Sequence, residues 1–74
     1  MNTTKQFGAW IRKTRRGFNL TLDDISAKAG MSKSHVSEIE NGKSAPTIET
    51  ASRLAAAFGL KLWQALRAAE EIKP

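Results

Sequence analysis

The sequence contains no cysteine, no tyrosine and a single histidine, and its apolar runs are short. Without cysteine there can be neither a disulfide framework nor a Cys-ligated zinc, and His35 alone cannot form a multi-histidine metal site. The longest apolar stretches, such as residues 54–58, fall far short of the roughly 20 residues of a membrane span, and nothing resembles a signal peptide. We therefore expect a cytoplasmic chain that needs no cofactor and closes on packing alone.

Length and charge favour one small basic domain. We expect a single domain over residues 1–74, because so short a chain buries too little surface for two cores and has no room for a separate ligand-sensing domain. Twelve Lys and Arg residues against seven Asp and Glu give a net charge of +5, and eight of the basic residues lie within residues 1–43. This excess favours a nucleic-acid partner for the first half of the chain.

The composition favours helices, since Ala, Leu, Lys, Arg and Glu are abundant and β-branched runs are scarce. Cap residues and glycines divide the chain into five predicted helices. They run over residues 4–16, from a Thr21 cap to Gly30, from a Ser32 cap to Asn41-Gly42, from Pro46-Thr47 to Gly59, and over residues 62–72. The fold class is therefore all-α.

Apolar residues recur at helical spacing in these segments and predict the buried faces. The first helix carries Phe7, Trp10, Ile11 and Thr14, after which Phe18 and Leu20 are expected to return the chain to the core. The fourth helix has the most regular stripe, made of Ile48, Ala51, Leu54, Ala55 and Phe58. The fifth helix offers Leu62, Leu66 and Ala69.

The second and third predicted helices are short and nearly contiguous, which is typical of a helix-turn-helix. A small residue lets the two helices approach, a glycine supplies the positive φ of the turn, and apolar residues fill the angle between them. The residues that meet these requirements are Ile25, Ala29, Gly30, Met31, Val36 and Ile39.

With these landmarks the sequence resembles the Cro and repressor family of lambdoid phages, also called the Xre family. The likeness runs from about Phe7 to Leu66 and is clearest in Ile39-Glu40-Asn41-Gly42-Lys43, in Pro46-Thr47-Ile48 and in residues 54–59. It implies a five-helix phage-repressor-like DNA-binding domain with the helix-turn-helix in helices 2 and 3. Two positions depart from the family pattern: Leu22 stands where Gln is frequent, and Ser26 where Ala is frequent.

The third helix has a polar arc opposite Val36 and Ile39, and a recognition helix reads bases with its exposed N-terminal side chains. The predicted base-reading residues are Lys33, Ser34, Ser37 and Glu38. The predicted phosphate contacts, which would fix register without reading sequence, are Thr21, Asn41, Lys43 and Ser44. The alternative is that the arc is an ordinary solvated surface and that Thr21 and Asn41-Gly42 are helix caps.

Other charged residues have two readings each. The resemblance implies a partly buried ion pair between Arg15 and Glu40, while Arg12, Lys13 and Arg16 are either a solvated face or phosphate contacts. Asp23 and Asp24 suit the dipole at the start of the second helix, or they touch RNA polymerase as acidic residues do in some relatives. His35 is expected to be a packing residue, with a pH switch as the alternative.

Trp63, Leu66 and Ile72 exceed what five short helices need for one core, so we expect a homodimer built on the fifth helix. The alternative is that Trp10 and Trp63 simply fill the core. The predicted function is a dimeric repressor that binds double-stranded DNA at a palindromic operator. The alternatives are an antitoxin or restriction-modification controller that acts with a partner such as a toxin, and a protein-binding adaptor. An enzyme is not expected, since His35 has no motif-placed carboxylate partner.

Overall fold

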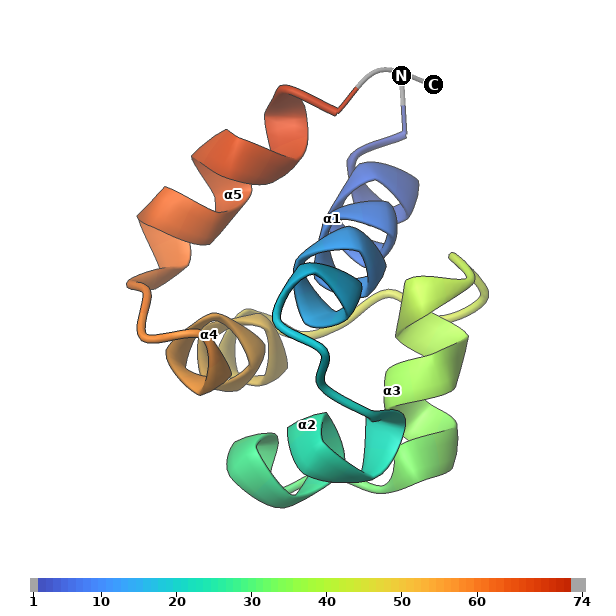
Figure 1. Cartoon of the computed structure of the whole chain (residues 1–74). Helices are drawn as coiled ribbons and strands as arrows, with labels where there is room; N and C mark the ends of the chain where they lie inside the picture. The colour runs from blue at the N-terminus through green and yellow to red at the C-terminus, as the bar shows by residue number, and fades with distance from the viewer. Residues whose placement is uncertain (1, 73–74) are drawn as a thin grey trace.

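The computed structural model describes residues 2–72, which form five α-helices and no strand (Figure 1). The helices are α1 (Thr3–Gly17), α2 (Leu22–Ala29), α3 (Lys33–Glu40), α4 (Ile48–Ala57) and α5 (Leu62–Glu70). The predicted all-α, five-helix class is therefore confirmed. None of these helices is long and apolar enough to cross a membrane.

Side chains cap the starts of the first four helices. The side-chain oxygens of Asn2, Thr21, Ser32 and Thr47 each accept a hydrogen bond from a backbone N–H of the first turn. Such a bond satisfies one of the donors that a helix start leaves unpaired and contributes roughly 1 kcal/mol. The predicted caps at Thr21 and Ser32 are thus confirmed, as is the predicted start of the fourth helix at Pro46-Thr47.

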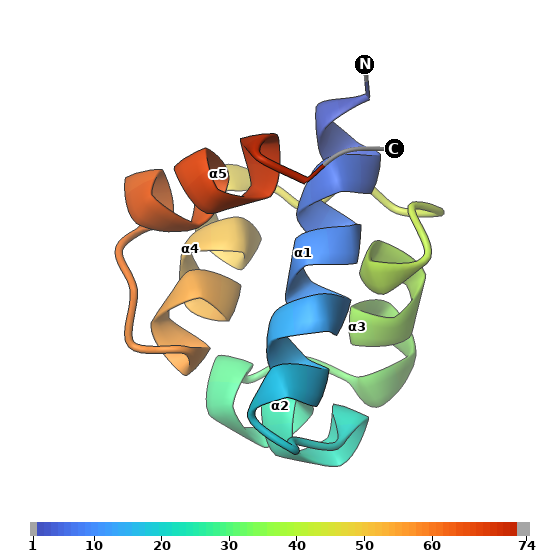
Figure 2. The same cartoon turned by 45° about the horizontal axis from the view of Figure 1, so that its top comes forward.

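Helix α1 lies in the middle of the molecule, with α3 packed on one side and α5 on the other (Figures 1 and 2). Helix α2 packs against α3 and α4, and α4 in turn packs against α5. One hydrophobic core joins all five helices. Its buried apolar members are Phe7, Trp10, Ile11, Ile25, Ala29, Val36, Ile39, Ala51, Leu54, Ala55, Ala65 and Ala69.

Three large apolar side chains are exposed, and two of them, Ile48 and Phe18, were expected in the core. Ile48 was expected in the α4 stripe but is 79% exposed, because it is the first residue of the helix and lies beyond the core. Phe18 was expected to return the chain to the core but is 63% exposed, and its ring stacks on Phe58 at 6.2 Å between centroids. Trp63 is 60% exposed, so the alternative that both tryptophans fill the core is wrong for Trp63 and right for Trp10.

Helix α5 is turned slightly from its predicted orientation. Ala65 and Ala69 are the fully buried residues, whereas Leu62 and Leu66 lie at the margin of the core and are half-buried. Small side chains at the contact let α5 approach α1 and leave room for the indole of Trp10, which is buried. The apolar period therefore predicted the helix correctly but not the centre of its packed face.

The contact between α1 and α3 is so close that it requires a glycine. A Cβ atom on Gly8 would lie 2.0 Å from the carbonyl oxygen of Ile39 and 3.1 Å from that of Glu40. Both are backbone atoms of α3, so neither can swing aside as a flexible side chain would. Any side chain at position 8 would push α3 away from α1.

We expect Gly8→Ala to lower the free energy of unfolding by about 2 to 3 kcal/mol, as overpacking does in a well-packed contact. Gly17→Ala is the matched control, because a Cβ at Gly17 meets nothing within 4 Å and alanine suits a helix better than glycine. Urea denaturation of both variants measures the difference. Equal stability of the two variants would mean that α1 and α3 are not in fixed contact.

Candidate DNA-binding surface

The turn between α2 and α3 consists of Gly30, Met31 and Ser32. Gly30 has φ of 68°, a left-handed conformation that strains any residue with a side chain. The backbone N–H groups of Gly30 and Met31 both donate to the Ser26 carbonyl oxygen, and the Ser26 hydroxyl donates to that of Met31. The departure from alanine at position 26 therefore adds a hydrogen bond that fastens the turn.

The angle between α2 and α3 is filled by apolar side chains. Ile25 and Ala29 of α2 are buried against Val36 and Ile39 of α3, while Met31 is half-buried at the turn. The turn and these contacts give α3 one fixed orientation relative to α2. The predicted residues thus come together as the core of a helix-turn-helix.

The predicted base-reading residues share one outward surface of α3, here called the recognition surface and made of Lys33, Ser34, Ser37 and Glu38. Lys33, Ser34 and Glu38 are exposed, and Ser37 is half-buried. They begin at the first residue of the helix, where Ser32 accepts a hydrogen bond from the His35 backbone N–H at 3.1 Å. These side chains therefore lie together at the surface, beside the start of α3.

Two members of the recognition surface have partners within the chain: the Ser37 hydroxyl oxygen accepts a hydrogen bond from the Asn41 amide at 3.4 Å, and Lys33 forms an ion pair. The Lys33 ammonium nitrogen lies 3.7 Å from a carboxylate oxygen of Asp23, in the first turn of α2. Both side chains are more than half exposed, and an exposed pair of this kind is worth about 0 to 1 kcal/mol. The ion pair therefore directs the Lys33 side chain from α3 toward α2. Because the pair is weak, Lys33 can leave Asp23 at little cost in free energy.

Two of the predicted phosphate contacts have structural roles. Thr21 forms a capping box with Asp24: its hydroxyl oxygen accepts from the Asp24 N–H at 3.1 Å, and its own N–H donates to the Asp24 carboxylate at 2.8 Å. These hydrogen bonds hold the pKa of Asp24 below its ordinary value. Asn41 donates its amide N–H to the Ser37 carbonyl oxygen at 2.9 Å and closes α3. Thr21 and Asn41 therefore act as helix caps, which was the alternative to a phosphate contact, and both residues are exposed.

The remaining predicted phosphate contacts, Lys43 and Ser44, lie in the segment that leads from α3 to α4. Lys43 is exposed and Ser44 is half-buried. The backbone N–H of Lys43 donates to the Glu38 carbonyl oxygen at 2.9 Å, which holds this segment against the end of α3.

No group of three or more metal-ligating side chains gathers anywhere in residues 2–72.

Arg15 and Glu40 form the ion pair that the resemblance implied. Two guanidinium nitrogens of Arg15 donate to the two Glu40 carboxylate oxygens, at 2.7 and 3.0 Å, and a third donates to the Leu20 carbonyl oxygen at 3.0 Å. The side chains are only 13% and 4% exposed, and the hydrogen bond with Glu40 raises the pKa of Arg15. One arginine thereby connects α1, the loop before α2 and the end of α3.

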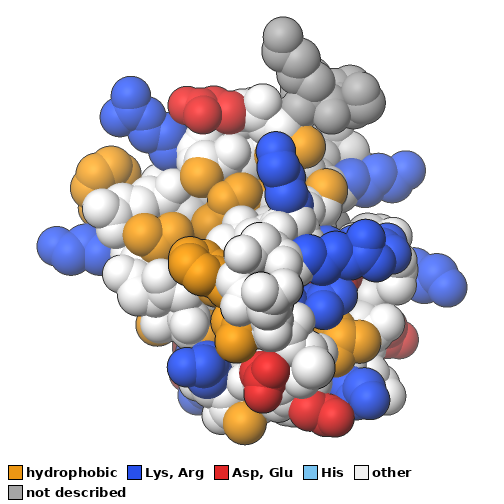
Figure 3. Space-filling view, viewed as in Figure 1, with side chains coloured by type: hydrophobic (Ala, Val, Ile, Leu, Met, Phe, Trp, Pro, Cys, Tyr) orange, Lys and Arg blue, Asp and Glu red, His pale blue; other side chains and the backbone are white. Residues whose placement is uncertain are grey.

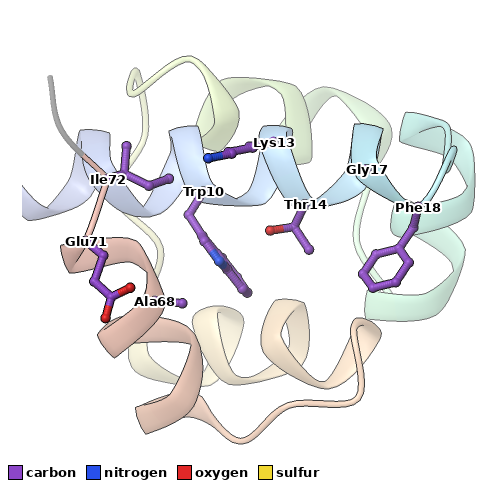
Figure 4. Close-up of a pocket in the computed structure, with 8 residues that line it drawn as sticks. All are labelled: Trp10, Lys13, Thr14, Gly17, Phe18, Ala68, Glu71 and Ile72. Carbon is purple, nitrogen blue, oxygen red and sulfur yellow. The ribbon is translucent and has the colours of Figure 1, made fainter.

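The structure places the three predicted dimer residues in three different surroundings. Leu66 lines an apolar groove of about 160 Å³ at the starts of α1, α4 and α5, together with Phe7, Ile48 and Leu62. Ile72 instead lines a second hollow between α1 and α5, shared with Trp10 and Phe18 (Figure 4). Trp63 belongs to neither lining and stands exposed on α5 beside Leu62.

Sequence reasoning missed Gly8, although a glycine inside a helix is a usable signal of close backbone approach. It also missed Gln6, whose amide donates to the carbonyl oxygens of Glu70 and Ile72 at 3.5 and 3.2 Å. The exposure of Ile48 had no local signal, because its spacing fits the apolar stripe of α4.

Comparison of the sequence with known proteins identifies a family with this arrangement of helices. Residues 11–62, which hold the whole helix-turn-helix and α4, match the family described as Helix-turn-helix. The chain is 36% identical over 58 residues to the 10 kDa protein of the ImmF control region of Bacillus phage phi105, covering 78% of this chain and 64% of the phage protein.

Two bacterial relatives are named as transcription regulators. The HTH-type transcriptional regulator y4dJ of Sinorhizobium fredii is 33% identical over 60 residues, which cover 81% of this chain and 78% of that protein. The HTH-type transcriptional regulator DdrOP3 of Deinococcus deserti is 32% identical over 60 residues, which cover 81% of this chain but only 46% of the relative. The chain therefore spans between about half and three quarters of these relatives.

We expect Arg15→Met to destabilise the fold by about 3 to 5 kcal/mol, because it leaves the buried carboxylate of Glu40 without its counter-charge. The double variant Arg15→Met/Glu40→Leu removes both charges and should regain most of that loss. Thermal and urea unfolding of wild type and both variants provide the comparison. If the double variant were as unstable as the single one, the cost would come from lost packing rather than from an unpaired charge.

Proposed function

The chain belongs to the helix-turn-helix family of DNA-binding transcription regulators, and we propose that it is a dimeric repressor that binds a palindromic operator through the major groove. In this proposal the regulator acts in the cytoplasm, at the DNA. Two copies present their recognition surfaces to half-sites one helical turn apart, about 34 to 36 Å, and exclude polymerase from the promoter.

The observation that carries the proposal is the intact recognition surface at the start of α3. Lys33 can donate to the O6 and N7 acceptors of guanine, Ser34 and Ser37 can pair with several base edges, and Glu38 can accept from the amine of cytosine. The proposed phosphate contacts Thr21, Asn41, Lys43 and Ser44 flank this surface at the start of α2 and after α3. They would fix the register while α3 reads the sequence.

The exposed apolar residues near the start of α5 support dimerisation. Trp63 and Ile48 are large and are 60% and 79% exposed; Ile48 lines the groove together with Leu66, while Trp63 directly follows Leu62 of that lining in the chain. A two-fold contact would set this surface against its own copy, so that an exposed side chain of one protomer enters the groove of the other. Because Ile72 lies in the other hollow, the proposed interface centres on Trp63 and Leu66.

Selection of binding sites from a random duplex pool, with wild type and with Lys33→Ala, tests the operator proposal. Wild type should recover a two-fold symmetric site, and Lys33→Ala should relax the preference at one position in each half-site at a cost of about 1 to 3 kcal/mol. Lys61→Ala, which changes an exposed lysine outside the helix-turn-helix, serves as the control. Recovery of asymmetric or unrelated sequences by wild type would refute the proposal.

Sedimentation at micromolar concentration tests the dimer. Wild type should sediment as a dimer and Trp63→Gln as a monomer with the same helix content, since this side chain is outside the core. Phe18→Gln is a matched control, because Phe18 is equally exposed but belongs to the other hollow. A wild-type monomer at this concentration, or dissociation by Phe18→Gln instead, would contradict the proposed interface.

A further inference from the structure

Helix α1 carries a basic groove that the proposed function leaves unused. The groove is lined by Ala9, Arg12, Lys13, Arg16 and Glu40 and has a volume of about 570 Å³. Lys and Arg side chains gather on this side of the molecule, over α1 and toward α3 (Figure 3). We call this feature the α1 basic groove.

The positive charge of the groove is not balanced within the chain. Ion pairs in residues 2–72 engage Arg15, Lys33 and Arg53, and none of them includes Arg12, Lys13 or Arg16, which are all exposed. The one carboxylate in the lining, Glu40, is already held by two hydrogen bonds from Arg15. The groove therefore presents three uncompensated cations to solvent.

The cations along one face of α1 are spread over a length that several phosphates of one DNA strand would occupy. Lys5, Ala9, Arg12 and Arg16 recur at intervals of four, three and four residues, so they form one straight ridge along α1. At 1.5 Å per residue the ridge is about 16 Å long, while phosphates of one DNA strand follow one another every 3.4 Å along the duplex axis. The small side chain of Ala9 opens the middle of the ridge.

The groove lies beside the recognition helix rather than behind it. Glu40, the last residue of α3, forms part of its wall. At the other end of the ridge, Lys5 lies against the backbone that follows α3, since a Cβ on Gly42 would come within 2.9 Å of the Lys5 Cγ. A duplex held by α3 would pass alongside these cations.

We propose that the α1 basic groove binds backbone phosphates of the operator duplex outside the base pairs that α3 reads, as a second, sequence-independent DNA contact. This inference rests on the proposed function, since it assumes that α3 holds an operator. The groove raises affinity and makes it more sensitive to salt, because each neutralised phosphate releases condensed counterions. It adds no preference among sequences, because phosphates are the same at every base pair.

The test compares two variants with the same change of net charge. Arg12→Gln/Lys13→Gln/Arg16→Gln removes the groove cations, and Lys28→Gln/Lys61→Gln/Arg67→Gln removes three exposed cations elsewhere. Glutamine is a good helix former, so both variants should fold, which circular dichroism verifies. The affinity of each for the selected operator is measured over a range of salt concentrations, and phosphate-ethylation interference maps the phosphates that each requires.

We expect the groove variant to lower the slope of log affinity against log salt by about 2 to 3, as the loss of three phosphate contacts on B-DNA predicts. It should also lose interference at a continuous run of phosphates, while it selects the same operator sequence as wild type. The control triple variant should keep the slope and the interference pattern of wild type.

Equal slopes for the two variants would overturn the inference, because the effect would then follow net charge alone. A lower slope with an unchanged interference pattern would also overturn it, since the groove would then hold something other than the operator duplex, such as a second duplex. Failure of wild type to select any operator would instead be a failure of the proposed function, which separates the two results.

Discussion

Helix α1 meets the end of α3 through two contacts, the backbone approach at Gly8 and the Arg15–Glu40 ion pair. A helix of eight residues is too short to be stable alone in water, so the position and the order of α3 depend on what packs against it. Gly8 sets the distance between the two helices, and the ion pair sets the rotation of one against the other. Arg15 also binds the Leu20 carbonyl oxygen, which brings the start of α2 into the same arrangement.

Local chemistry explains why much of the fold was predictable from the sequence. A capping side chain bonds to a backbone N–H three residues away, so Thr21, Ser32 and Thr47 locate their helices without help from distant segments. Gly30 locates the turn for the same reason, because the positive φ there is a property of one residue. The Arg15–Glu40 pair was expected from the resemblance, not from local pattern.

Long-range packing determined what the sequence could not predict. Periodicity predicts which residues of a helix share a face, but the neighbouring helix decides where along that face the burial ends. Ile48 and Phe18 each lie at a helix terminus, just past the last covering element, and remain exposed. In α5 the small Ala65 and Ala69 permit the closest approach, so they are more buried than the larger leucines. The identity of the base-reading and phosphate-binding residues stays a prediction, because a free surface does not reveal its partner.

The hydrogen bonds of Gln6 fasten the first turns of α1 to the last turn of α5 and the residues after it. The beginning of α1 and the end of α5 are therefore held together at the end of the molecule opposite α2 (Figure 1). These two segments thus lie side by side, away from the surface that α2 and α3 present. The order in which the helices are connected is thus less constrained than their packing, and a circularly permuted chain opened between α4 and α5 would retain every interhelical contact.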